Sequence, residues 1–425
     1  MRFVIATLHY AGLGFALRLL DEGHEVILAP VGTEDRRSCA SYELIGNGLV
    51  EKRWFTDVIR DRSEFRDAIW IWDENHSVDE NETLRREGFR VFAGGKYPDT
   101  MEHDRAACLE FVAKYGLQPP PSKAFDDPAS ASKFLEAHPG RSYVCKPDHG
   151  ETYETFVPQS DRPEEANLEL RGHLAAMRSN STFVLQERKD GIEANLEVWV
   201  VQGQPRFAFA TLEAKRKLNA DLGDFAACAL DFAFVVPLES EIVKQTVGRL
   251  FPAYRQMKYT GFADANFIAA RDGVWFLEKC ERFGYNAHPN LFWTLNRDPL
   301  AKVFDTMLDG SFTPNFAPGF GATISMYQDH KVPGSVIQYP DTVAKDVYLY
   351  DAQRVDGQLL TCGYYDDVLL ATGYGYTIPT AWEAALNVAR TVKFPGRSFR
   401  TDGAGVDYPS SPLRRYEALQ AMGWL

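Results

Sequence analysis

The chain has 425 residues, of which 45% are hydrophobic and 13% aromatic, so it holds enough apolar material for buried cores and is not a disordered chain. Its 46 basic and 59 acidic side chains give a formal net charge of −13, which argues against binding of a nucleic-acid polymer through a basic face. No apolar run approaches the roughly 20 residues that cross a bilayer, so we expect no membrane partner. The 6 cysteines form no CxxC pair, which favours reduced thiols in a cytoplasmic protein over a zinc or disulfide framework.

The first hundred residues alternate between apolar strands and helical patterns. A helical pattern at residues 15–20 follows the first strand and precedes the second. The expected strands lie at residues 2–6, 25–29, 68–72 and 89–93. Strands separated by helices are typical of a doubly wound parallel sheet, so we predict an α/β domain over residues 1–95.

Two glycines, Gly12 and Gly14, stand between the first strand and the first helical pattern. A nucleotide-binding fingerprint has a third glycine, but Leu17 occupies that position here. We therefore interpret the two glycines as a tight strand-to-helix turn, with a nucleotide fingerprint as the alternative.

The middle of the chain has a different pattern of predicted helices and strands. A helix is expected at about residues 104–115, and the three prolines at 119–121 form a rigid linker or lead into a strand. Beyond them, short strands alternate with helices or follow one another directly, which is typical of an α+β domain. The expected strands are residues 142–146, 182–187, 196–201, 262–268 and 274–277. The last two form a hairpin-like pair, and the final hundred residues are rich in strands, with a helix near residues 381–390.

The hairpin-like pair carries the most informative side chains. Asn266 and Glu278 place oxygen atoms on one face of two adjacent strands. Carboxylate and amide oxygens are the hard ligands that Mg²⁺ prefers, so the pair is a candidate site for Mg²⁺ or Mn²⁺. Carboxylates are also common at strand ends without any metal role, and that alternative stays open.

At these residues the sequence resembles a known family. The first strand begins Tyr259-Thr260-Gly261-Phe262, and the second continues as Glu278 followed by Arg282-Phe283-Gly284. Both runs are similar to the metal-binding strands of ATP-grasp ligases, and within them to the phosphoribosylamine–glycine ligases of purine synthesis. Two further motifs occur in the family's order, namely Lys215-Arg216 before the run at 221–223, and the run VKFPGRSFRTD at 392–402.

The resemblance implies a three-part architecture that covers nearly the whole chain. A Rossmann-like pre-ATP-grasp domain at residues 1–95 precedes a split ATP-grasp domain at 96–315, whose small lid subdomain spans about 122–190. A β-rich C-terminal domain then occupies residues 316–425. By the same resemblance we expect a monomer or a homodimer.

The resemblance also implies a role for particular residues around ATP. Arg105 and Lys146 correspond to cations that reach the phosphates, which need positive charge to offset them. The run Gln186, Glu187 and Arg188 resembles the hinge that binds adenine, and Glu193 resembles the carboxylate on the ribose hydroxyls. The expected catalytic contacts to phosphate or acyl phosphate are Lys215, Arg216 and Arg282, and the expected metal ligands are Glu278 and Asn266.

The implied activity is an ATP-dependent carboxylate–amine ligation. A carboxylate attacks the γ-phosphate of ATP with Mg²⁺ bridging the phosphates, and an amine then captures the acyl phosphate as an amide. The expected partners are therefore small molecules, namely an amino acid carboxylate and an amine such as a nucleotide. In this chemistry the protein supplies position and charge, and no side-chain nucleophile is needed.

Several positions depart from the family pattern. Cys280 stands where the family has an asparagine metal ligand and is a poor partner for Mg²⁺, although Asn266 occupies a neighbouring position. The loop at residues 149–155 has one glycine and two carboxylates, and the runs at 12–15 and 285–287 differ from those of the family. Three hypotheses follow: a ligase with the family's own substrates, a ligase of the same scaffold acting on another amine, or a degenerate protein that binds without turnover.

Overall fold

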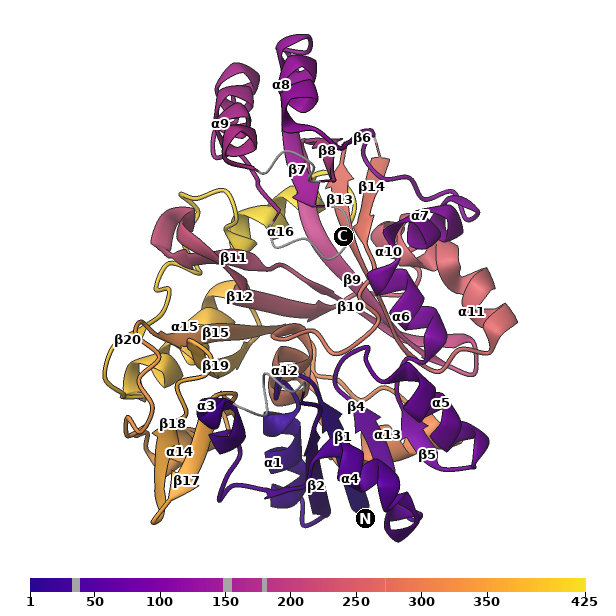
Figure 1. Ribbon diagram of the computed structural model, residues 1–425, viewed down its shortest axis with the longest axis vertical. Helices are drawn as coiled ribbons and strands as arrows, with labels where there is room; N and C mark the ends of the chain where they lie inside the picture. The colour runs from indigo at the N-terminus through magenta and orange to yellow at the C-terminus, as the bar shows by residue number, and fades with distance from the viewer. Residues whose placement is uncertain (33–38, 148–154, 178–181, 272) are drawn as a thin grey trace.

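The computed structural model describes residues 1–32, 39–147, 155–177, 182–271 and 273–425. It combines a parallel N-terminal sheet, a large antiparallel sheet and a small separate sheet with two helices (Figure 1). This mixture of α/β and α+β parts confirms the predicted fold class. The predicted loop at residues 149–155 lies almost entirely outside the described residues.

The N-terminal strands form a five-stranded parallel sheet of order β3-β2-β1-β4-β5. Its strands are β1 (Arg2–Thr7), β2 (Glu25–Pro30), β3 (Glu51–Lys52), β4 (Ile69–Trp72) and β5 (Arg90–Phe92). Its helices are α1 (Leu13–Asp21), α3 (Ala40–Leu44), α4 (Phe55–Arg60) and α5 (Val78–Arg86). Successive residues of β1 pack into two different apolar clusters, with Phe3 in one and Val4 in the other. Both faces of the sheet are therefore buried, as a doubly wound sheet requires.

The lid is a three-stranded antiparallel sheet of order β6-β8-β7 with two helices (Figure 1, top). After α6 (Lys96–His103) and α7 (Arg105–Ala113), the prolines lead into the first strand of the lid. The lid elements are β6 (Ser122–Phe125), α8 (Pro128–Glu136), β7 (Tyr143–Pro147), α9 (Pro163–Ala176) and β8 (Phe183–Glu187). They enclose a small apolar core of their own, which makes the lid a distinct packing unit.

The central sheet is ten-stranded and has the main order β14-β13-β9-β10-β12-β15-β19-β16, with β11 paired to β12 and β20 to β15. Its strands are β9 (Ile192–Val201), β10 (Gln204–Thr211), β11 (Ala214–Leu218), β12 (Leu222–Val235), β13 (Gly261–Ala270), β14 (Gly273–Glu278), β15 (Phe320–Gln328), β16 (Val347–Leu349), β19 (Asp367–Gly375) and β20 (Arg397–Ser398). The expected hairpin of residues 262–277 is the antiparallel pair β13–β14. Because β12 pairs with β15, one sheet crosses the boundary expected at residue 315, and the domain limits stay a prediction.

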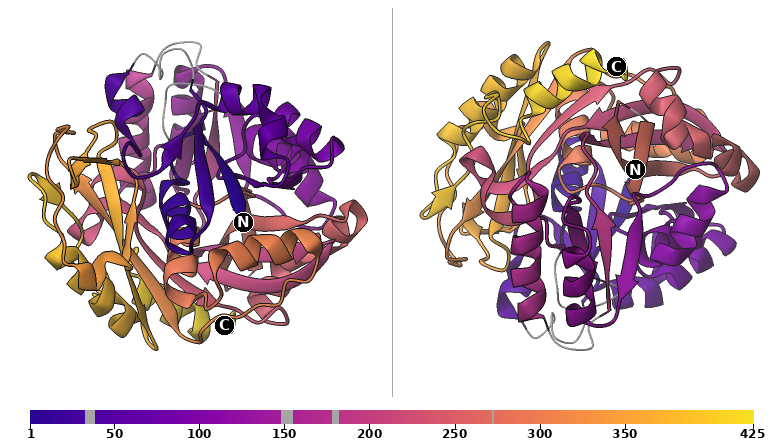
Figure 2. Two further views of the ribbon diagram at one scale, coloured as in Figure 1. Left: turned by 90° about the horizontal axis from the view of Figure 1, so that it is seen from below. Right: turned by 90° about the horizontal axis from the view of Figure 1, so that it is seen from above.

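Helices and a short hairpin cover the central sheet. They are α10 (Glu241–Gln245), α11 (Phe251–Met257), α12 (Ala287–Asn290), α13 (Leu300–Asp309), α14 (Asp341–Ala344), β17 (Ala352–Val355), β18 (Gln358–Thr361), α15 (Ile378–Thr391) and α16 (Pro412–Ala421). The largest apolar cluster joins the N-terminal domain to this sheet, since Phe15 of α1 packs against Phe283 and Tyr348. The C-terminal segments, orange to yellow, accordingly flank the indigo N-terminal domain (Figure 2). Among the helices of the described residues, none has both the length and the apolar composition of a membrane span.

Candidate active site

Several of the predicted nucleotide contacts meet where the lid joins the central sheet. Burial lowers the pKa of Lys146, at the end of β7, below its ordinary value; Glu278 and Glu193 oppose this shift, while Arg105 and Lys215 add to it. Five side chains from α7, the lid and three strands of the central sheet therefore share one electrostatic environment. The structure brings together residues that are up to 173 positions apart in the chain.

Lys215 on β11 is held between two carboxylates. Its Nζ lies 3.5 Å from Oε1 of Glu193 and 4.0 Å from Oε2 of Glu213. The pKa of Lys215 is raised above its ordinary value, chiefly by the charge of Glu193, and the pKa of Glu193 is lowered, chiefly by Lys215. Burial raises the pKa of Glu213. Lys215 is thus a permanent cation at neutral pH, as a contact to phosphate requires.

A second cation lies behind this pair, and no sequence motif indicated it. Arg415 of α16 is only 6% exposed. Its guanidinium donates one hydrogen bond to the backbone carbonyl of Glu213, at 2.6 Å, and another to the backbone carbonyl of Glu193. The C-terminal helix thereby ties β9, which carries Glu193, to the connection between β10 and β11, which carries Glu213. Because Arg415 is distant from them in sequence, only the tertiary structure reveals this contact.

The predicted metal ligands are neighbours across β13 and β14. Asn266 and Glu278 are register partners, and Nδ2 of Asn266 donates to Oε1 of Glu278 at 3.0 Å. A carboxylate and an amide suit Mg²⁺, which usually takes few protein ligands and fills its shell with water and substrate phosphates. Burial raises the pKa of the Cys280 thiol well above its ordinary value, and the charge of Glu278 adds to this shift. Cys280 is therefore a neutral thiol, and among the described residues no three His, Cys, Asp or Glu side chains form a metal-binding group.

The segment after β14 is anchored by a buried ion pair. Lys279 and Glu281 are 1% and 2% exposed, and their charged atoms lie 2.5 Å apart. The hydroxyl of Tyr254 on α11 donates to Glu281 at 2.9 Å and accepts from Lys279 at 3.0 Å. Lys279 and Glu281 are therefore fixed in the interior, whereas the alternate residues Glu278, Cys280 and Arg282 are more exposed.

Arg282 lies at the side of the site that faces the N-terminal domain. Its Nε is 2.7 Å from Oε1 of Glu102, and Glu102 also accepts a hydrogen bond from Asn75 at 2.8 Å. Burial lowers the pKa of Arg282, but the charge of Glu102, its hydrogen bond to Arg282 and other neighbouring groups together outweigh this effect, and the net shift is upward. Arg282 is thus a partly buried cation between the central sheet and the end of β4.

The other predicted residues are engaged in local contacts. The Gln186 side chain is buried, and the backbone N–H groups of Glu187 and Arg188 donate to the carbonyls of Pro121 and Ser142 at 2.8 Å. Any main-chain contact from the run 186–188 to adenine would therefore use other atoms. The remaining partners are Asp161 for Arg188, Lys189 for Glu187, and the Gly223 carbonyl with the Phe225 ring for Arg216. The adenine and phosphate roles of these three side chains stay predictions.

The ends of β1 and β4 present a second polar group that sequence reasoning did not identify. His9 Nδ1 lies 2.7 and 2.8 Å from the two carboxylate oxygens of Glu74. The Tyr285 hydroxyl is 3.4 Å from Glu74 and 3.5 Å from His9. Polar residues directly after two adjacent parallel strands are the signal that identifies such a crevice.

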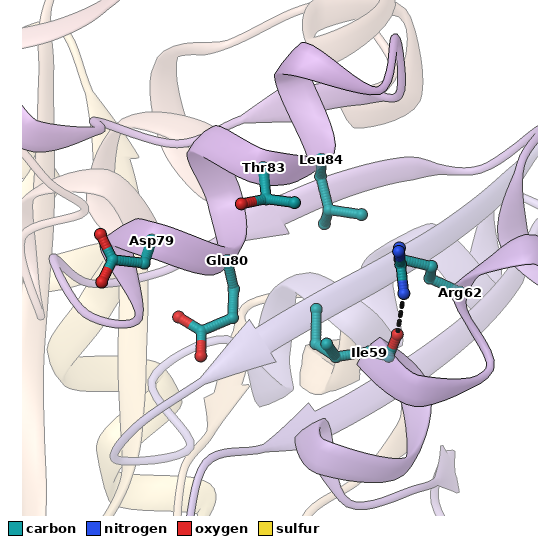
Figure 3. A pocket seen from close by; sticks show the side chains of 6 residues that line it. All are labelled: Ile59, Arg62, Asp79, Glu80, Thr83 and Leu84. Atoms are coloured by element: carbon teal, nitrogen blue, oxygen red, sulfur yellow. Dashed lines mark hydrogen bonds between the residues drawn. The ribbon is translucent and has the colours of Figure 1, made fainter.

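A further hollow lies on the N-terminal domain between α4 and α5 (Figure 3). It is lined by Ile59, Arg62, Asp79, Glu80, Thr83 and Leu84. Arg62 donates to the carbonyl of Ile59 at 3.3 Å, and its guanidinium also pairs with Glu87. None of the predicted site residues lines this hollow, so it is separate from the candidate active site.

Comparison with known proteins identifies distant relatives of the chain. No protein-family model matches the chain. The phosphoribosylamine–glycine ligase of Caulobacter vibrioides is 24% identical over 336 residues, which cover 74% of this chain and 77% of that protein. The enzyme of the same name from Haemophilus influenzae is 22% identical over 343 residues, which cover 76% and 78%. The trifunctional purine biosynthetic protein adenosine-3 of Drosophila pseudoobscura pseudoobscura is 24% identical over 213 residues, and the chain spans only 16% of that longer protein.

Solved structures extend the resemblance to the whole fold. The phosphoribosylamine–glycine ligase of Thermotoga maritima superimposes with a TM-score of 0.70 at 18% identity, covering 95% of this chain and 100% of that one. The biotin carboxylase domain of the Hydrogenobacter thermophilus 2-oxoglutarate carboxylase, solved with MgADP, gives a TM-score of 0.62 at 11% identity over 93% and 91% of the two chains. The predicted resemblance to ATP-grasp ligases of the phosphoribosylamine–glycine ligase type is thereby confirmed, and the chain has their fold.

Proposed function

We propose that the protein is an ATP-dependent ligase that activates a carboxylate as an acyl phosphate and transfers the acyl group to an amine. The observation that carries this proposal is the meeting of Lys146, Glu193, Lys215 and Glu278 where the lid joins the central sheet. Two cations from opposite subdomains can clamp a triphosphate there, and a substrate carboxylate beside them can attack its terminal phosphorus.

The residues of the chain have distinct tasks in this reaction. Lys146 and Lys215 offset the charge that spreads over the transferring phosphoryl oxygens. Glu193 keeps Lys215 charged and in position, as their mutual pKa shifts indicate. Glu278 and Asn266 would hold the Mg²⁺, which neutralises phosphate charge when it is bound.

The test is release of ADP from ATP and Mg²⁺ with glycine, alone and with a panel of amines, alongside capture of the acyl phosphate by hydroxylamine. We expect hydroxamate that depends on the carboxylate. The Lys215→Met variant should lose it, whereas Lys217→Met, on the same strand but paired with Asp366, should retain it. Nucleotide binding without ADP in any combination would contradict a ligase and favour a protein that binds without turnover, for which Cys280 is the specific argument.

A further inference from the structure

Two motifs that lie far apart in the sequence, residues 215–223 and 392–402, meet in the structure. The first spans most of β11, the turn Asn219–Asp221 and the start of β12, and the second follows α15 and includes β20. The C-terminal segment passes the turn of the β11–β12 hairpin and forms hydrogen bonds with it (Figure 1). The C-terminal motif therefore lies beside the strand that carries Lys215.

The strand ladder of β11 does not by itself fix the position of Lys215. Among the described strands, β11 pairs only with β12. The register shifts between Ala214 and Arg216 and again between Arg216 and Leu218, so the ladder is interrupted around Lys215. Such irregularities disrupt the pairing locally and change the direction in which side chains point. Contacts from outside the ladder are needed to hold this part of the strand.

Arg400 holds the main chain next to Lys215. It is 1% exposed, and its guanidinium donates to the backbone carbonyl of Arg216 at 3.1 Å. The same guanidinium donates twice to the carboxylate of Asp402, at 2.9 and 2.8 Å, and once to Asp221 at 2.9 Å. A planar guanidinium can make all of these contacts because its five N–H groups have fixed, diverging directions. Arg400 therefore joins the C-terminal segment to β11 and to the turn that follows it.

The turn of the hairpin also depends on the C-terminal segment. Ala220 and Asp221 have φ values of 58° and 57°, in the left-handed region that is unfavourable for residues with a side chain. The Ala220 N–H donates to the carboxylate of Asp402 at 2.8 Å. The Asn219 side chain exchanges two hydrogen bonds with Thr401, at 2.8 and 2.9 Å. The strained turn is thus held in place by residues about 180 positions later in the chain.

Two buried arginines of the C-terminal segment contact the main chain on either side of Lys215. Arg415 donates to the carbonyl of Glu213, two residues before Lys215. Arg400 donates to the carbonyl of Arg216, one residue after it. Both arginines are at most 6% exposed, so water competes little for these contacts. The position of Lys215 is therefore set by the C-terminal segment together with the sheet.

We propose that Arg400 is a positioning residue for Lys215, which it holds where this lysine meets the phosphates of ATP. The inference rests on the proposed ligase function, in which Lys215 offsets phosphoryl charge. Arg400 acts through the carbonyl of Arg216 and through the turn at Asp221, since its guanidinium is buried and already contacts two carboxylates. Because a displacement of about 1 Å can slow a reaction roughly 10²-fold, release of β11 lowers ATP affinity and turnover in a chain that is still folded.

A double-mutant cycle with Lys215 tests this inference. Arg400→Lys keeps a positive charge between the two carboxylates, but an ammonium cannot reproduce the fork of contacts. In calorimetric titrations with Mg²⁺, we expect Arg400→Lys and Lys215→Met each to weaken ATP binding roughly tenfold, the loss of one charge-assisted hydrogen bond. The double variant should bind ATP as Lys215→Met does, because both substitutions remove the same contact. Losses that multiply, or wild-type affinity in Arg400→Lys, would overturn the inference.

Asn219→Ala decides the question if Arg400→Lys does not fold. Asn219 is exposed, and its substitution removes two hydrogen bonds to Thr401 while it leaves the buried charges in place. We expect ATP affinity to fall roughly threefold, and to be unchanged by Asn219→Ala when Lys215→Met is already present. The same threefold loss in both backgrounds, or no loss in either, would then contradict a role of the turn in positioning Lys215.

Arg90→Lys is the matched control, because the Arg90 guanidinium also contacts a carboxylate and a backbone carbonyl, both of Asp305, between β5 and α13. It should keep wild-type ATP affinity. Hydroxamate formation separates the inference from the ligase function, and Arg400→Lys should lower its rate roughly 10²-fold. Absence of hydroxamate from the unaltered protein would overturn the ligase function alone, since the cycle on ATP affinity would still decide the role of Arg400. Wild-type ATP affinity in Lys215→Met would instead overturn the inference.

Discussion

Asn266 and Glu278 face each other across β13 and β14, with Nδ2 of Asn266 3.0 Å from Oε1 of Glu278. The charge of the same carboxylate raises the pKa of Lys146, against the lowering that burial causes, and it also raises the pKa of Lys215. Glu278 therefore lies within electrostatic reach of both cations that we assign to the phosphates. A metal ion held by Glu278 would add positive charge close to those phosphates.

We expect Glu278→Gln to weaken Mg²⁺-dependent ATP binding by at least the roughly 10–100-fold typical of substitutions around a metal site. The substitution preserves shape and removes only the charge that attracts the cation. Titration of ATP by calorimetry, with and without Mg²⁺, measures the effect. The exposed carboxylate of Glu110 gives the matched control, Glu110→Gln. An unchanged Mg²⁺ dependence in Glu278→Gln would remove Glu278 from the metal site.

The pH dependence of ATP affinity should identify Lys146. Its pKa lies below the ordinary value because burial disfavours the charged form, so the affinity should be constant at lower pH and fall as the pH rises through this lowered pKa. The pKa values of Lys215 and Arg282 are raised, and those cations persist over the same range.

Fluorescence of a labelled ATP analogue at increasing pH measures this alkaline loss. In Lys146→Gln the affinity should be weaker by roughly tenfold, the loss of one charge-assisted hydrogen bond, and it should lack the alkaline decline. In Lys146→Arg the affinity should also be independent of pH over this range. An alkaline decline that persists in Lys146→Gln would contradict the assignment.

The strands can be predicted from the hydrophobic pattern of the sequence because nearly all of their residues are buried and apolar. In β1 and β4 every residue or nearly every residue is buried, and such apolar runs are unambiguous. The predicted phosphate contacts Lys146 and Lys215 and the predicted metal ligand Glu278 came from family motifs, and the structure groups these side chains. A motif does not determine which partner a side chain contacts. Arg216 and Arg188 belong to the same motif runs, yet in the structure they contact local partners.

The residues that sequence reasoning missed depend on tertiary contacts. Arg415 reaches strands about 200 positions earlier in the chain, and nothing local distinguishes it from Arg414. The pair His9 and Glu74 forms because β1 and β4 are adjacent, a fact that follows from the strand order and not from either segment alone. Continuity of the sheet through β12 and β15 likewise depends on pairing between segments about 90 residues apart.

Gly14 shows that the two glycines of the first turn serve packing. A Cβ at Gly14 would lie 2.4 Å from the buried ring of Tyr348, so Gly14→Ala should lower the free energy of unfolding by about 1–3 kcal/mol. At Gly172, in α9, no atom of the described residues outside the local helix backbone lies within 4 Å of such a Cβ, and Gly172→Ala should raise the free energy of unfolding by about 0.5–1 kcal/mol. Urea denaturation of both variants measures the difference. A neutral effect at Gly14 would mean that Tyr348 can move aside.

Arg415 offers the sharpest test of how the C-terminal helix supports the ATP site. Its guanidinium bridges the backbone carbonyls of Glu213 and Glu193, and a single ammonium cannot reproduce that fork. Arg415→Met leaves both buried carbonyls without this donor. Because two hydrogen bonds to a charged group are lost, we expect the free energy of unfolding to fall by about 3 kcal/mol.

The same substitution should weaken ATP binding, because Glu193 and Lys215 lose their common support. Arg415→Lys should restore part of the stability and little of the affinity, whereas Arg414→Met, on the exposed side of α16, should change neither. Denaturation and ATP titration on the same preparations separate the two effects. If Arg415→Met retains a folded chain and wild-type ATP affinity, the segments at Glu193 and Glu213 hold the site without the C-terminal helix.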